Sequence, residues 1–230
     1  MCGRFIQYSD PQIYADDFDL ELDPQSAAPP RPRYNLAPSQ SVLAVRAGPD
    51  GRRHLEPLRW GLVPAWSRGP DSRYTMINAR AETVAEKPAY RAAFRARRCL
   101  IPTEGFYEWQ VRPGGKQPYL IRRGAGRVFA MAGLWEHWAG TGETAPIDSC
   151  TIIVTAANAA IAPIHDRMPV VLDPDAQARW LDPANRDTAA LLALLKPAPP
   201  ADWTLMPVSR RVNNARLDDP GLIEPVALAD

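Results

Sequence analysis

Glycine- and proline-rich turns divide the chain into many short apolar segments, and this division constrains the fold more than any other feature. Runs rich in β-branched and aromatic residues alternate with turns such as Gly48-Pro49-Asp50-Gly51 and Pro113-Gly114-Gly115. Short strands with interspersed helices favour an α+β fold, with a curled, barrel-like antiparallel β-sheet core flanked by short helices. We expect one domain over residues 1–230. The expected strands span residues 41–45, 55–63, 99–101, 105–111, 117–122, 128–134 and 150–155.

Helix signals are fewer. Ser9-Asp10-Pro11 and Asp173-Pro174 each place a capping side chain before a proline, which is typical of a helix start. We expect the remaining connections to be loops, including the proline-rich stretch 20–33 and the stretch 64–75. The expected helices span residues 12–18, 88–94, 157–161, 173–181 and 187–195.

Composition excludes several classes of protein. The chain has 230 residues with 46% hydrophobic content, enough for a sizeable core, and it contains no apolar run of about 18 residues that would span a membrane. The N-terminus lacks the basic and apolar regions of a signal peptide, so we expect a cytoplasmic location. The cysteines and histidines show no metal-ligand spacing, and we expect no metal and no cofactor. Three cysteines do not make a disulfide framework, and we expect Cys99 and Cys150 to be buried core thiols.

The charge is nearly balanced but has an unusual make-up. The formal net charge is +1, and the basic residues are 24 arginines and 3 lysines. Arginine presents a planar fork suited to phosphate, so the bias is compatible with nucleic-acid contact. A GC-rich genome produces the same bias, and composition alone does not separate the two explanations.

The first five residues, Met1-Cys2-Gly3-Arg4-Phe5, carry the most reactive group of the chain. A small second residue permits removal of Met1, and Cys2 then bears a free α-amine beside its thiol. The two groups titrate near ~8 and ~8.5 in peptides, so both have a reactive fraction at neutral pH. Such a 1,2-aminothiol condenses with an aldehyde to a Schiff base and closes to a five-membered thiazolidine. The alternative is an ordinary cysteine in a frayed terminus.

Three further motifs carry polar groups suited to chemistry. Asn78-Ala79-Arg80 follows a loop and precedes a helix, where it offers an orienting amide and a phosphate-binding guanidinium, or merely a helix cap and a surface arginine. In Gly105-Phe106-Tyr107-Glu108-Trp109, strand alternation puts Glu108 on the face of Phe106. Glu108 is then either a desolvated general acid–base or a solvent-facing side chain. His165-Asp166-Arg167-Met168-Pro169 combines an imidazole with a guanidinium, or forms a charged turn.

Two segments are suited to contact with nucleic acid. Trp66, in the loop after Trp60-Gly61-Leu62-Val63-Pro64, can stack on a base or cover the edge of the core. The polar stretch 208–214 suits a groove for a nucleic-acid backbone or a solvated loop.

Taken together, these motifs closely resemble the SOS-response-associated peptidase (SRAP) family of abasic-site-processing proteins. They occur in family order over nearly the whole chain, and no position that carries chemistry departs from the family pattern. Two stretches, the proline-rich loop 20–33 and the glycine-rich hairpin near 140, look like variable regions. The matching segments are Met1–Phe5, Tyr34–Pro38, Trp60–Trp66, Asn78–Glu82, Gly105–Trp109, Val154-Thr155, His165–Pro169 and Val208–Asn213.

The resemblance implies a role for each matching residue. Cys2 would form a thiazolidine with the ring-opened aldehyde of an abasic site in single-stranded DNA. Asn78 would position the amine and the sugar, Glu108 would shuttle protons, and His165 would assist ring opening and reversal. Arg4, Arg80 and Arg167 would hold phosphates, while Trp66 and Pro38 would shape the path of the strand. The implied DNA-binding residues are Gly3, Arg4, Pro38, Trp66, Arg80, Thr155, Arg167 and Ser209.

The protein would act as a monomer that shields the lesion during replication, associated with the nucleoid when it is bound to DNA. Because the Schiff base is also the intermediate of β-elimination, an AP-lyase activity that accompanies the crosslink is left as an open alternative. Two other hypotheses remain. One is a cysteine peptidase or autoprocessing hydrolase that uses Cys2, and the other is a module that binds single-stranded DNA or a modified base without forming a bond.

Overall fold

The computed structural model describes residues 2–20, 22, 31–48, 51–70 and 75–228, and in them the chain forms two curled β-sheets with short helices at the sides. The strands are β1 (Arg4–Gln7), β2 (Arg33–Leu36), β3 (Ser41–Ala47), β4 (Arg53–Trp60), β5 (Asn78–Arg80), β6 (Arg98–Thr103), β7 (Gly105–Arg112), β8 (Gly115–Arg123), β9 (Phe129–Trp138), β10 (Ile147–Ala156), β11 (Arg167–Pro169), β12 (Val171–Leu172) and β13 (Trp203–Pro207). The helices are α1 (Pro11–Phe18), α2 (Arg91–Ala96), α3 (Pro174–Leu181) and α4 (Thr188–Leu192), with 3₁₀ turns η1 (Gly124–Gly126), η2 (Arg210–Asn213) and η3 (Pro220–Ile223).

One sheet closes on itself. Its order is β11-β10-β4-β3-β6-β9-β12, and β9 also pairs with β10, so that β10, β4, β3, β6 and β9 form a ring. Most pairings are antiparallel, but β10 runs parallel to β4 and to β5. The expected α+β class with a curled, barrel-like sheet is confirmed, and the two parallel pairings add to it.

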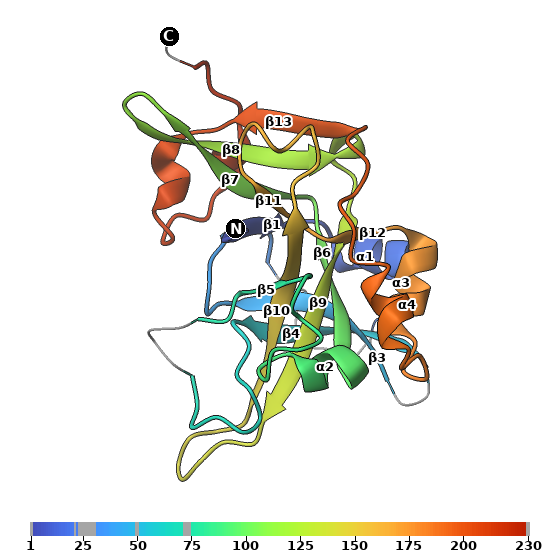
Figure 1. Cartoon of the computed structure of the whole chain (residues 1–230). Helices are drawn as coiled ribbons and strands as arrows, with labels where there is room; N and C mark the ends of the chain where they lie inside the picture. Colours follow the sequence, from blue (N-terminus) through green and yellow to red (C-terminus); the bar gives the residue numbers. More distant parts are fainter. Residues whose placement is uncertain (1, 21, 23–30, 49–50, 71–74, 229–230) are drawn as a thin grey trace.

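The second sheet, in the order β13-β8-β7-β1-β2, covers one end of the ring (Figure 1). A core that includes Phe5, Trp60 and Phe106 lies between the sheets. The rings of Phe5 and Trp60 meet edge to face at 4.9 Å, and burial of such aromatic side chains contributes roughly 2–3 kcal/mol each. The outer face of this sheet carries Tyr107 and Leu120, which pack against the C-terminal residues Val208, Val212 and Leu222.

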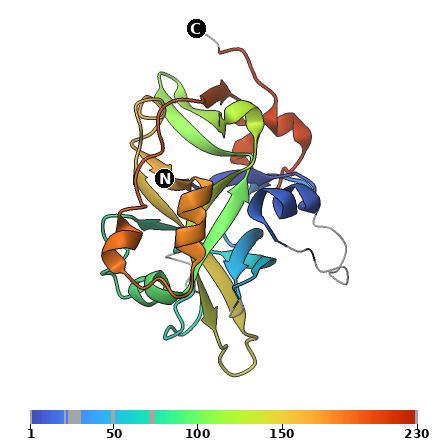
Figure 2. The same ribbon diagram turned by 90° about the vertical axis from the view of Figure 1, so that its right-hand side faces the viewer.

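The helices pack on the flank of the ring, where Figure 2 shows α3 and α4 toward the viewer. Asp10 and Asp173 cap α1 and α3 as expected, each accepting a hydrogen bond from a backbone amide of the first turn. The buried guanidinium of Arg98 donates to the carbonyls of Phe94 and Trp180, which satisfies the C-terminal ends of α2 and α3.

Several local expectations were wrong. Residues 157–161 form turns and no helix. The Asn158 side chain accepts hydrogen bonds from the amides of Ala160 and Ile161 as a helix cap would, but Pro163 has no amide hydrogen with which to continue the ladder. Asn78–Arg80 is strand β5 instead of the entry to a helix, and the expected helix 88–94 begins only at Arg91. Much of the expected loop 20–33 lies outside the described residues.

Candidate functional site

Cys2 lies in the core between the two sheets. Its side chain is fully buried beside Phe5 and Trp60, and its thiol is 3.9 Å from the carbonyl oxygen of Arg4. Burial, together with the nearby Glu108 carboxylate, raises the pKa of the Cys2 thiol far above its ordinary value. The thiol is therefore protonated at neutral pH and needs a base when it attacks an electrophile.

Asn78 holds the backbone of Cys2. Its Nδ2 donates a hydrogen bond to the Cys2 carbonyl oxygen at 2.9 Å, and its Oδ1 is buried without a hydrogen-bond partner among the described residues. The position of Asn78 is set by β5, which pairs with β10 so that Asn78 lies opposite Ile152. The hydroxyl of Tyr90 donates to the Asn78 carbonyl oxygen at 3.2 Å and ties the next segment to the same strand.

Glu108 lies on β7 and is only 2% exposed. Phe106 belongs to the core around Cys2, whereas Tyr107 and Trp109 belong to the cluster on the opposite face, so the expected alternation is confirmed. The register between β1 and β7 pairs Arg4 with Tyr107 and directs the segment ahead of Arg4 toward Glu108. Burial raises the pKa of Glu108, and its electrostatic interaction with His165 offsets part of the rise.

His165 follows the turns between β10 and β11. Its Nδ1 accepts a hydrogen bond from the Arg167 backbone amide at 3.0 Å, which in the neutral ring puts the proton on Nε2. The same Nδ1 lies 2.9 Å from the carboxylate of Asp166, to which it donates a hydrogen bond only when it carries the proton itself. Because the Asp166 side chain is 85% exposed, the backbone amide is the firmer of the two contacts. Gln110 Nε2 donates to the Pro163 carbonyl oxygen at 3.0 Å and connects these turns to β7.

The three arginines have different environments. Arg4 donates from Nη1 to Asn35 Oδ1 at 2.9 Å and to the Val212 carbonyl oxygen at 2.8 Å, two neutral acceptors that leave its charge in place. Arg80 is exposed at the end of β5. Arg167 donates from Nη1 to the Glu82 carboxylate at 2.5 Å.

An open pocket of about 510 Å³ includes in its wall Asn78, the residue that holds the backbone of Cys2. It combines aromatic rings with two cations, and none of the described residues that line it is acidic. The side chain of Trp66 is 70% exposed, which favours the first of the two alternatives, a surface for stacking, over a cover for the edge of the core. The lining residues are Trp66, Met76, Asn78, Arg80, Thr83, Lys87, Pro88, Ala89 and Tyr90.

The remaining predicted residues are more dispersed. Gly3 is half-buried beside Cys2, and Thr155 is buried on β10 opposite Met168. Pro38 lies in the turn before β3, and Ser209 caps η2 through its hydroxyl. Among the described residues, no hydrogen bond or ion pair joins Pro38 or Ser209 to Cys2 or to the pocket.

Sequence reasoning missed Tyr90 and Lys87, which line the pocket. Both fall in or beside a segment expected to be a helix, and their spacing carries no signal of a site. Cys99 and Cys150 are free, buried thiols as expected. In the described residues there is no group of three potential metal-ligating side chains and no helix long and apolar enough to span a membrane.

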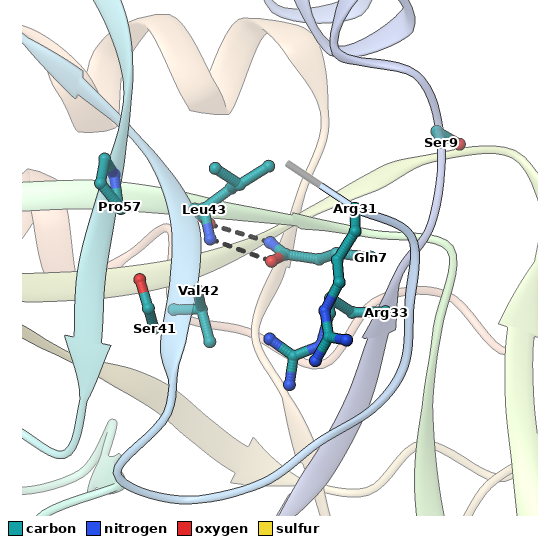
Figure 3. A pocket seen from close by; sticks show the side chains of 8 residues that line it. All are labelled: Gln7, Ser9, Arg31, Arg33, Ser41, Val42, Leu43 and Pro57. Carbon is teal, nitrogen blue, oxygen red and sulfur yellow. Dashed lines mark hydrogen bonds between the residues drawn. The ribbon is translucent and has the colours of Figure 1, made fainter. Parts of the chain in front are cut away.

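A second pocket, of about 240 Å³, lies at the far end of β1 and contains none of the predicted site residues. Figure 3 shows Arg31 and Arg33 beside it, with Gln7 bonded through its amide to the backbone of Leu43. Arg33 pairs with Asp218 at 2.5 Å, so part of the positive charge there is already neutralised.

The fold and the site together define a β-rich protein with a buried cysteine at residue 2, next to an open, positively charged pocket. The family model of SOS response associated peptidase (SRAP) matches residues 1–215. The chain belongs to this family.

Two named relatives and one solved structure are similar to this chain over nearly its whole length. Abasic site processing protein YoqW of Bacillus subtilis (strain 168) is 41% identical, covering 97% of this chain and 99% of the relative. Abasic site processing protein YedK of Escherichia coli (strain K12) is 33% identical, covering 98% of this chain and all of the relative. A crystal structure of a protein from Bacteroides thetaiotaomicron is similar in fold, with a TM-score of 0.86 at 23% identity, over 98% of this chain and 100% of that one.

Proposed function

We propose that this protein captures abasic sites in single-stranded DNA through a covalent thiazolidine on Cys2. The observation that carries the proposal is the hydrogen bond to the Cys2 carbonyl from Asn78, which is itself part of the pocket wall. The relatives YoqW and YedK, both named abasic site processing proteins, support the substrate class.

The chemistry begins once Met1 is removed. The α-amine of Cys2 adds to the C1′ aldehyde of the ring-opened sugar, and the resulting carbinolamine loses water to give a protonated imine. The protonated Glu108 carboxyl supplies the proton that leaves with the hydroxyl as water. Its raised pKa favours this acid form in the buried site.

Ring closure returns the proton. The thiol sulfur bonds to C1′ while its proton passes to the Glu108 carboxylate, and the electrons of the imine double bond move to the nitrogen. The product is a neutral thiazolidine, and Glu108 is again an acid. Because the thiol is itself buried and protonated, this step needs the adjacent carboxylate.

The pocket suits a single strand better than a duplex. An exposed indole offers a stacking surface, and Arg80 and Lys87 offer charges for phosphates. Arg167, which is not part of the pocket lining, offers a further charge for a phosphate. His165 lies within electrostatic reach of Glu108 and is suited to exchange protons with the sugar hydroxyl during ring opening.

The test is a denaturing gel with an oligonucleotide that carries one abasic site. Wild-type protein is expected to shift the oligonucleotide, and the intact mass is expected to lack Met1 and to equal protein plus DNA less one water. Cys2→Ala is expected to form no adduct, and Cys2→Ser is the closest control for size and polarity. An adduct that persists in Cys2→Ala, or cleaved strand in place of an adduct, would contradict the proposal. A panel of peptides cleaved only when Cys2 is present would instead support a peptidase.

A further inference from the structure

Glu82 lies beside two of the cations that the proposed function assigns to DNA phosphates. Arg167 donates a hydrogen bond from Nη1 to Glu82 Oε1, and the charge of Arg80 also acts on the carboxylate. Partial burial raises the pKa of Glu82, but its backbone hydrogen bond and the two arginines outweigh this effect and lower it overall. Glu82 is therefore ionised at neutral pH. The group Arg80, Arg167 and Glu82 carries a net charge of +1 in place of +2.

We propose that Glu82 is a specificity-determining residue that occupies Arg167 in the DNA-free protein and weakens the binding of intact strands. The proposal rests on the proposed function, since it takes Arg80 and Arg167 as phosphate contacts. Its ligand is a backbone phosphate of single-stranded DNA, which must displace the carboxylate or bind against its charge.

The geometry favours competition over permanent pairing. The Glu82 side chain is 49% exposed and the Arg167 side chain 26% exposed, and ion pairs so open to water are weak. A phosphate that approaches Arg167 meets a carboxylate of the same sign, so each intact strand loses part of the attraction that arginine would otherwise supply. A strand with an abasic site is held by the bond to Cys2 and does not depend on this contact.

The consequence is selectivity for the lesion. Binding through phosphates alone does not distinguish damaged from intact DNA, and a carboxylate that lowers such binding reduces the time spent on intact strands. Covalent capture then decides where the protein stays. This role also accounts for an acidic residue near a basic pocket whose described lining residues include no acidic side chain.

The experiment compares wild-type protein with Glu82→Gln on an intact, dye-labelled single-stranded oligonucleotide, by fluorescence anisotropy over a range of salt concentrations. Glutamine keeps the shape and a hydrogen-bond acceptor for Arg167 but removes the charge. The variant is expected to bind about two- to fivefold more tightly, the size of effect typical of an exposed charge pair. Its plot of log affinity against log salt is expected to be steeper by about 0.7, the value for one additional phosphate contact on a single strand.

The matched control is Glu86→Gln, which removes the same charge from an exposed position in the same segment. It is expected to leave the salt dependence unchanged. In an Arg167→Gln background, Glu82→Gln is expected to lose most of its effect. Equal or weaker binding by Glu82→Gln would overturn the proposal and make Glu82 a residue that positions Arg167. An equal gain in affinity from Glu86→Gln would show that the effect of Glu82→Gln comes only from the change in net charge, and would also overturn the proposal.

Failure of the proposal for Glu82 and failure of the proposed covalent function would give different results. Absence of an adduct with abasic DNA in wild-type protein would reject the covalent mechanism, whatever Glu82→Gln does on intact DNA. If wild type forms the adduct, Glu82→Gln is expected to form it as well, with a smaller ratio of abasic to intact binding. Formation of the adduct with an unchanged ratio would reject the role of Glu82 alone.

Discussion

Asn78 donates a hydrogen bond to the backbone carbonyl of Cys2 across 2.9 Å, although the two residues are 76 positions apart in the chain. The bond fixes the main chain of residue 2, not its thiol, so it orients the amine and the side chain together. Tyr90 supports the same strand from the other side through the Asn78 carbonyl.

Asn78→Ala is therefore expected to slow formation of the abasic-site adduct by about 10- to 100-fold, because misplacement of reacting groups by a fraction of an ångström is costly. The free energy of unfolding is expected to fall by only about 1 kcal/mol, the net worth of one hydrogen bond. Single-turnover kinetics on a gel and thermal melting check the two effects. Tyr90→Phe, which keeps the ring, is the milder companion variant. An adduct that forms at the wild-type rate in Asn78→Ala would contradict the positioning role.

Glu108→Gln is expected to slow the adduct by about 100-fold, since it removes the proton carrier. The melting temperature of the variant, in contrast, is expected to be higher than that of wild type at neutral pH. Because the folded pKa of Glu108 is raised, wild-type protein loses stability as pH rises from the unfolded value of about 4.3 through the folded pKa. Glutamine has no such loss, so the variant should melt higher than wild type at pH 7.5 and nearly equal to it at pH 4. A lower melting temperature at pH 7.5 would show that the carboxylate itself stabilises the fold.

Trp66→Ala is expected to weaken binding of single-stranded DNA by about 1–3 kcal/mol, the worth of one base stacked on an aromatic ring. The side chain is 70% exposed, and its removal should change the free energy of unfolding by less than about 0.5 kcal/mol. Val111→Ala is the control, because Val111 is also apolar and is 78% exposed at the far end of β7. Titration by anisotropy and thermal melting separate the effects. Equal weakening in both variants would remove Trp66 from the binding surface.

Asn35→Ala is expected to lower the free energy of unfolding by about 2–4 kcal/mol. Asn35 is fully buried, accepts a hydrogen bond from Arg4, and directs its Nδ2 toward the carbonyls of Val212 and Leu217 at 3.2 and 2.9 Å. Asn214 is an exposed residue between Val212 and Leu217, and Asn214→Ala is expected to lower the free energy of unfolding much less. Chemical denaturation measures both. Similar losses in the two variants would mean that the network around Asn35 is not specific.

The sequence predicted the face of the strand on which Glu108 lies, but it did not predict the environment of that face. Strand alternation placed Glu108 on the face of Phe106, because the period of two is a local property. Whether that face is covered depends on the packing of one sheet on the other, which no local pattern contains. The burial of Glu108 therefore became clear only from the structure.

The same reason explains the error at Asn78–Arg80. Three residues are too few to carry a strand signal, and β5 exists because it pairs with Ile152, Ile153 and Val154 far along the chain. The error at residues 157–161 has a local cause: alanine-rich composition and the Asn158 cap favour a helix, but Pro163 ends the ladder after one turn because it has no amide hydrogen.

The pairing of strands that are distant in the chain also has a consequence for folding kinetics. The proposed site draws on residues 2, 78, 108 and 165, and the pairing of β1 with β7 and of β5 with β10 joins segments distant in the chain. Folds dominated by such non-local pairing form in milliseconds to seconds, after loops have closed at an entropic cost. Until then Cys2 has neither its amide anchor nor the nearby carboxylate, so the proposed capture of a lesion begins only when the last strands have met.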